Sequence, residues 1–78
     1  MILPHSYILV QNTYYFHEKP FHCYGIAIVE HLEPVATITR TVSNLSCNRL
    51  AVMKLVNLCN HLELSPIHLD DVIEDFLS

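Results

Sequence analysis

Cys59, His61 and His68 are the residues whose types and spacing come closest to a chemical site in this chain of 78 residues. Thiolate and imidazole are good zinc ligands, so these three side chains could serve a metal- or small-ligand-binding sensor. The spacing is weak evidence, because the chain contains neither a CxxC nor an HExxH motif. The simpler interpretation makes Cys59 a small core residue and places both histidines at the surface around an interhelical turn. We therefore expect no metal and no cofactor, and keep the sensor as the alternative.

Motifs for nucleophilic catalysis are missing from the sequence. There is no Gly-x-Ser-x-Gly elbow, and Gly25 is the single glycine, so a glycine-rich phosphate loop is excluded. The cysteines lack the flanking signatures of thiol enzymes. A core of this size also encloses little volume for a pocket. We expect a protein that is not an enzyme, and keep Cys-His catalysis as an alternative, because such partners can be brought together by the fold alone.

A polar patch is the other candidate site. His68 lies at the third helical position after Ser65, where a capping box would place Glu or Gln, and one turn before Asp71. The simpler interpretation is that these polar side chains form only local hydrogen bonds at the surface, since acids on amphipathic helices are usually solvated. The alternative is a recognition patch at the corner between two helices, formed by Asn60, His68, Asp71 and Asp75.

The first half of the chain is predicted to form β-strands. The segment from Ser6 to Phe16 is rich in Tyr, Ile, Val and Thr, and predicts one long strand or two short ones broken near Gln11-Asn12. Residues 17–20 predict a turn. Residues 24–30 are apolar on both faces, as expected of a central strand.

The third strand shows the clearest alternation. Within residues 35–42, Ala36, Ile38 and Val42 are expected on one face and the threonines on the other, with Arg40 interrupting the apolar series. Consecutive strands joined by short links usually pair as neighbours. Residues 6–42 therefore predict a three-stranded antiparallel meander.

Helices follow at about residues 46–62 and 66–77. The first is expected to start near residues 43–46, where Ser and Asn can cap it, and its apolar residues leave only a narrow polar stripe, so it needs two surfaces to cover it. Ser65-Pro66 predicts the start of the second. That helix carries an apolar seam at Leu69, Val72, Ile73 and Phe76, opposite Asp70, Asp71, Glu74 and Asp75. The fold class is α+β: one domain over residues 1–78, with a small meander and two C-terminal helices packed on one face of the sheet.

Charge and cysteine usage narrow the partners and the compartment. The formal net charge is −4, and the four basic residues are scattered, so we expect no nucleic-acid partner. Three cysteines at wide spacing, without a secretory signal, indicate a reduced cytoplasmic protein. No segment approaches the roughly 20 apolar residues of a membrane span.

The size of the chain favours contact with other proteins. A monomer of 9.0 kDa buries only about 63% of its unfolded surface and is marginally stable, and such domains often add a second copy of themselves. Together with the apolar first helix and central strand, this predicts a non-catalytic protein-interaction module that self-associates, with a homodimer as its expected form.

Three segments carry a resemblance to known proteins. They are Tyr24-Gly25-Ile26, then Leu55-Val56-Asn57-Leu58-Cys59-Asn60, and finally the C-terminal run Leu64-Ser65-Pro66-Ile67-His68-Leu69-Asp70-Asp71-Val72-Ile73-Glu74-Asp75-Phe76-Leu77. The chain resembles a family of small uncharacterised proteins, a domain of unknown function, from clostridia and related Gram-positive bacteria. The resemblance implies a bacterial cytoplasmic setting and this order of elements. It adds no activity, substrate or catalytic residue.

Overall fold

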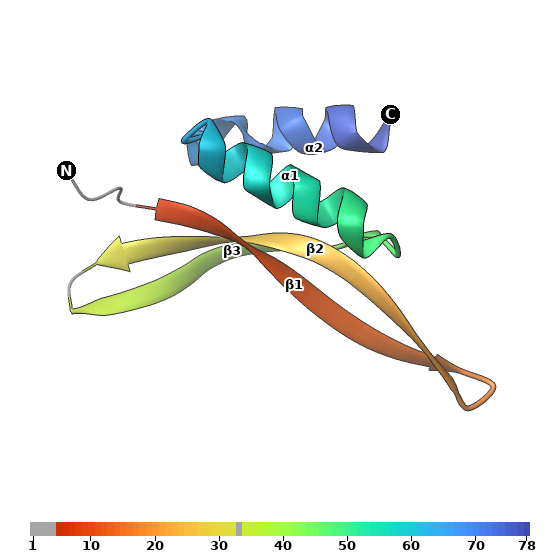
Figure 1. Cartoon of the computed structure of the whole chain (residues 1–78). Helices are drawn as coiled ribbons and strands as arrows, with labels where there is room; N and C mark the ends of the chain where they lie inside the picture. Colours follow the sequence, from red (N-terminus) through yellow and green to blue (C-terminus); the bar gives the residue numbers. More distant parts are fainter. Residues whose placement is uncertain (1–4, 33) are drawn as a thin grey trace.

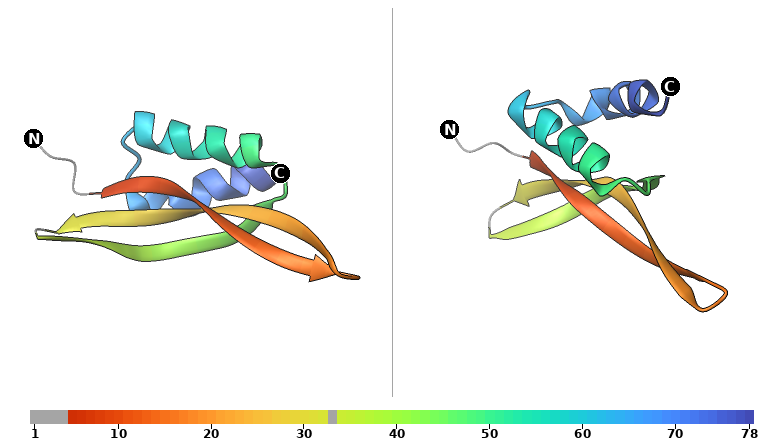
Figure 2. Two further views of the ribbon diagram at one scale, coloured as in Figure 1. Left: turned by 60° about the horizontal axis from the view of Figure 1, so that its bottom comes forward. Right: turned by 45° about the vertical axis from the view of Figure 1, so that its right-hand side comes forward.

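The computed structural model describes residues 5–32 and 34–78. Within these residues three strands precede the helical part, and the strands pair antiparallel in the order β1-β2-β3. Both α-helices lie on the same side of the sheet (Figures 1 and 2). This confirms the α+β meander with two C-terminal helices. The elements are β1 (His5–Phe16), β2 (Lys19–Leu32), β3 (Val35–Ser46), α1 (Arg49–His61), the short 3-10 helix η1 (Pro66–His68) and α2 (Leu69–Leu77).

The first hairpin projects beyond the rest of the molecule. β1 is one continuous strand of 12 residues, and His17 and Glu18 form its turn with positive φ angles of 50° and 64°. β3 follows β2 only as far as the pair between Tyr24 and Ser46, so residues 12–23 form a two-stranded ribbon, here called the hairpin arm. Pro20 pairs with Tyr15, next to the Phe16–Lys19 pair that closes the turn. Its nitrogen, which carries no hydrogen, therefore points away from β1 and toward no described strand, so the proline is tolerated there.

Gly25 lies where the backbone of β3 crosses close to β2. The register runs from the Tyr24–Ser46 pair to the Ile26–Val42 pair, so three residues of β3 bulge opposite this one glycine. A Cβ atom at Gly25 would lie 2.1 Å from the carbonyl oxygen of Val42. The single glycine of the chain is therefore needed for a close backbone approach.

A second irregularity in β3 reverses the faces of its side chains. Ile28 pairs with Arg40, but Val29 pairs with Ile38, which leaves Thr39 as an extra residue. Cross-strand partners share a face, so Val42 faces the helices with Ile26, whereas Ile38 faces the other side with Val29. The expectation that Ala36, Ile38 and Val42 share one face was wrong, because strict alternation does not allow for a bulge.

The start of α1 differs from the expected one near residues 43–46. Those residues continue β3, and the helix begins at Arg49. Asn48 is the N-cap, and its Oδ1 accepts a hydrogen bond of 3.2 Å from the backbone N–H of Ala51. Residues 43–45 form the bulge of β3 and Ser46 pairs with Tyr24, so the helix begins beyond this segment and Asn48 supplies the cap.

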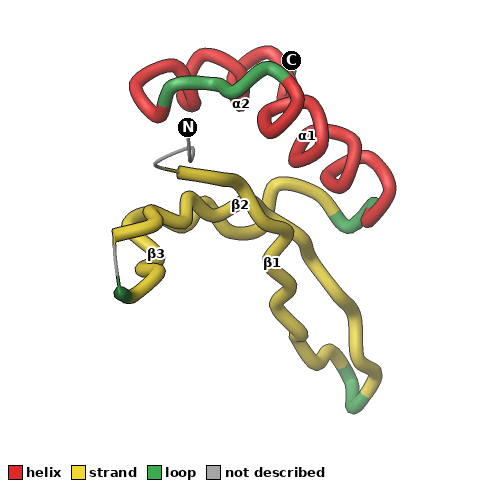
Figure 3. Tube along the Cα trace, turned by 60° about the vertical axis from the view of Figure 1, so that its left-hand side comes forward, coloured by secondary structure: helices red, strands yellow, loops and turns green. Residues whose placement is uncertain are grey.

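The helices form a layer over one side of the sheet (Figure 3), and the core lies between the two layers. The second helical segment begins at Pro66 as expected, but as η1, and α2 starts at Leu69. α2 buries Leu69 and Ile73 in the core, and Val72 and Phe76 pack against it, which confirms the predicted seam. The other buried side chains of this core are Tyr7, Tyr24, Ile26 and Ile28 from the sheet and Val52, Leu55, Val56 and Cys59 from α1.

Candidate functional site

An apolar patch lies on the side of the sheet that faces away from the helices. Because side chains alternate along β2 and Ile28 faces the core, Val29 points to the opposite side. Ile38 is 53% exposed there, and Ile8 is also exposed. This surface surrounds the buried Ala27, which is a cross-strand neighbour of Ile8. We call it the open face, and its residues are Ile8, Val10, Val29 and Ile38.

The hairpin arm extends the apolar surface beyond the body of the domain. Tyr14 and Phe21 pair across the two strands and stack with their ring centroids 5.5 Å apart. Phe16, which is 67% exposed, follows on the same side of β1. The hydroxyl of Tyr14 accepts a hydrogen bond of 2.7 Å from the side-chain nitrogen of Asn44 and so joins the arm to the bulge of β3. The arm projects away from both helices (Figure 1), and a two-stranded ribbon is only marginally stable in water on its own.

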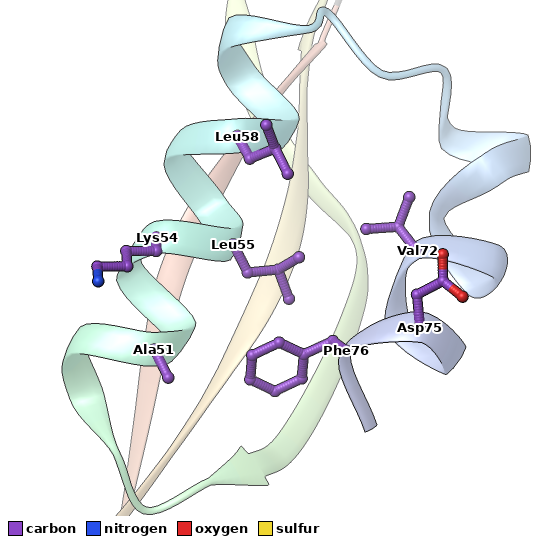
Figure 4. Close-up of a pocket in the computed structure, with 7 residues that line it drawn as sticks. All are labelled: Ala51, Lys54, Leu55, Leu58, Val72, Asp75 and Phe76. Carbon is purple, nitrogen blue, oxygen red and sulfur yellow. The ribbon is translucent and has the colours of Figure 1, made fainter. Parts of the chain in front are cut away.

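A groove runs between the two helices (Figure 4). It encloses about 420 Å³, and its walls are mainly apolar, with Phe76 of α2 pointing toward α1. Lys54 and Asp75 bring opposite charges from the two helices. The groove lacks the several convergent polar groups that fix a small ligand in most binding sites. Its lining residues are Ala51, Lys54, Leu55, Leu58, Val72, Asp75 and Phe76.

Asn60, predicted as part of the recognition patch, is engaged with the edge of the sheet. Its Oδ1 accepts a hydrogen bond of 2.8 Å from the backbone N–H of Tyr7, and its Nδ2 donates one of 2.8 Å to the backbone carbonyl of Tyr7. The phenol of Tyr7 donates a further bond of 2.6 Å to the carbonyl oxygen of Leu64. The Asn60 amide therefore acts as a strand partner would and ties the end of α1 to β1.

The other three patch residues do not gather around Asn60. His68 Nδ1 lies 3.9 Å from a carboxylate oxygen of Asp71, and both side chains are exposed. Asp75 lines the groove. Of the four predicted residues, the structure brings His68 and Asp71 together, while Asn60 serves the sheet edge.

The candidate metal ligands do not converge. Cys59 is only 1% exposed and sits in the core, where burial raises the pKa of its thiol. His61 is exposed, because two positions along a helix rotate a side chain to another face, and His68 is also exposed. Among residues 5–32 and 34–78, no group of three His, Cys, Asp or Glu side chains is placed to hold a metal ion.

Two contacts between distant residues were missed by the sequence reasoning. The sulfur atoms of Cys23 and Cys47 lie 3.3 Å apart. Arg40 on β3 forms an ion pair and hydrogen bond with Asp70 of α2, which lowers the pKa of that carboxyl and raises the pKa of the guanidinium. Both contacts depend on the bulges of β3, for which the sequence carried no signal except the isolated Gly25.

Comparison with known proteins gives a family and no function. In the part of the chain that the structure describes, no helix has the length and apolar character needed to cross a membrane. No curated protein and no solved structure matches the sequence. The model of one protein family, described as "Family of unknown function (DUF6514)", matches residues 2–78. Because this match spans nearly the whole chain, the protein belongs to the family of unknown function DUF6514.

Proposed function

We propose that this chain is a non-catalytic protein-interaction module of the bacterial cytoplasm that forms a homodimer through its open face. Neither a nucleic acid nor a membrane is part of this proposal. The observation that carries it is the uncovered apolar side of the sheet, centred on Ile38 and Val29. Contiguous exposed apolar surface of this kind is typical of protein–protein contacts.

The amount of exposed surface supports a second copy. The chain exposes 5614 Å², whereas a compact monomer of 9.0 kDa is expected to expose about 4,900 Å², so the excess is roughly 700 Å². A standard interface buries about 800 Å² on each partner. The excess surface is thus close to what one side of a stable dimer covers.

The distribution of charge also favours a copy of the same chain at the open face. The open-face residues are all uncharged, so two copies can meet there without like charges in contact. The acids that account for the net negative charge lie on α2, on the opposite side of the sheet (Figure 1). A face-to-face packing of two sheets about a two-fold axis keeps these acids apart.

Sedimentation velocity at micromolar concentration tests the proposal. The wild-type chain is expected to sediment as a dimer of 9.0 kDa subunits. Ile38→Glu places a carboxylate in the centre of the interface and should weaken association by about 100-fold or more, because an unpaired charge would be buried. A monomeric wild-type protein at these concentrations would contradict the proposal.

A matched variant on the other side of the molecule serves as the control. Ile67 is 80% exposed in η1, on the side of the helices. Ile67→Glu makes the same chemical change away from the open face and should leave the dimer intact. Circular dichroism must show that both variants are folded. Equal loss of the dimer in both would place the contact elsewhere.

A further inference from the structure

The fold places two thiols from distant segments side by side. Cys23 lies in β2 at the base of the hairpin arm, and Cys47 lies in the short connection between β3 and the N-cap of α1. The pairing of Tyr24 with Ser46 brings them together, because in an antiparallel pair the next residue on each side continues the ladder. Their sulfur atoms are 3.3 Å apart, and the residues are separated by 24 positions in the sequence.

Only a small movement would bond the two sulfurs. A disulfide has an S–S length of about 2.05 Å, so the atoms must approach by about 1.3 Å. Cys47 lies outside the regular helices and strands, where side chain and backbone can adjust. We propose that Cys23 and Cys47 form a reversible intrachain disulfide, with a low-molecular-weight disulfide as the oxidant. This modification site is separate from the proposed dimer and does not depend on it.

The reaction proceeds in two thiol–disulfide exchanges. Cys47 is exposed and Cys23 is half-buried, so the oxidant reaches Cys47 first. The Cys47 thiolate attacks one sulfur of the oxidant and forms a mixed disulfide with it. The S–S bond of the oxidant breaks, and its other half leaves as a thiol after taking up the proton released from Cys47. Cys23 then loses its proton and attacks the Cys47 sulfur of this mixed disulfide, releasing the second small thiol. The two protein thiols lose two electrons, and the oxidant is reduced to two thiols.

The surroundings fit this order of events. The hydrogen bond with Cys47, aided by partial burial, raises the pKa of Cys23, which therefore keeps its proton until the second step. Once formed, the bond would fasten the start of α1 and the end of β3 to β2. It closes a loop across the bulge opposite Gly25, and such a loop stabilises a protein mainly by restricting its unfolded chain.

Oxidation with glutathione disulfide tests the proposal. The expected product has lost two hydrogen atoms by intact mass, retains one of its three free thiols, and yields a Cys23–Cys47 linked peptide after proteolysis. Its Tm should rise by about 10 °C or more and return after reduction. Cys23→Ser and Cys47→Ser should each abolish this rise, and Cys59→Ala should still form the linked peptide.

Two other results would overturn the proposal. One is a bond between two chains, seen as a dimer on a non-reducing gel. The other is a protein that stops at the mixed disulfide on Cys47 with Cys23 still reduced. Repeating the reaction with Ile38→Glu at low protein concentration separates this inference from the proposed dimer, because an intrachain bond must form equally well in a monomer.

Discussion

Replacing Asn60 by alanine removes both hydrogen bonds that hold the end of α1 against β1. The amide accepts from the N–H of Tyr7 and donates to its carbonyl, at 2.8 Å in both cases. β1 is an edge strand, so in the variant these two partly buried backbone groups lose their partner. Solvent can reach them only in part, since the ring of Tyr7 is packed in the core.

The expected loss of stability follows from these two hydrogen bonds. Each bond contributes about 0.5–1.5 kcal/mol, so Asn60→Ala should lower the free energy of unfolding by about 1–3 kcal/mol. Alanine favours a helix over asparagine by roughly 0.5 kcal/mol, which offsets part of the loss. Asn57→Ala makes the same helical change at an exposed position one turn earlier and should be neutral or slightly stabilising.

Urea unfolding followed by circular dichroism measures the difference between the two variants. The two hydrogen bonds between Asn60 and Tyr7, here called the clamp, predict that Asn60→Ala is less stable than Asn57→Ala by about 1–3 kcal/mol. Hydrogen exchange at the Tyr7 amide should also become faster in the Asn60 variant alone. If the two variants agree within about 0.3 kcal/mol and the Tyr7 amide keeps its protection, the clamp contributes nothing and the reasoning fails.

Two further substitutions probe the register of β3 and its link to α2. Gly25→Ala should destabilise the protein by about 2–3 kcal/mol or more in urea unfolding, because its Cβ would meet the carbonyl oxygen of Val42 at 2.1 Å; wild-type stability would disprove the close approach. Asp70→Asn tests the ion pair with Arg40, which lowers the pKa of the carboxyl from its usual 3.8. A depressed pKa contributes stability that is present above about pH 4 and is lost as the pH falls through the folded value, so thermal unfolding from pH 5 to pH 2 should show a steeper loss for wild type than for Asp70→Asn. Parallel curves would contradict this link.

The candidate surface was only partly visible in the sequence. The central strand is apolar at successive positions, which predicts that another element packs on each of its faces. The structure covers one face with the helices and leaves the face with Val29 open. The location of Ile38 on this face could not be predicted, because the extra residue in β3 reverses the alternation. The recognition patch was placed at a helix corner from spacing alone, and spacing carries no information on the two bonds between Asn60 and Tyr7.

The sequence alone determined the order of strands and helices and the seam of α2. Those features follow from local rules: alternation along a strand, helical periodicity, and the preference of proline for the first turn of a helix. Tertiary structure decided which side of the sheet stays open, which thiols meet, and where α1 begins. These features depend on the register between β2 and β3. Register is set by contacts between residues far apart in the chain, and local sequence patterns do not encode such contacts.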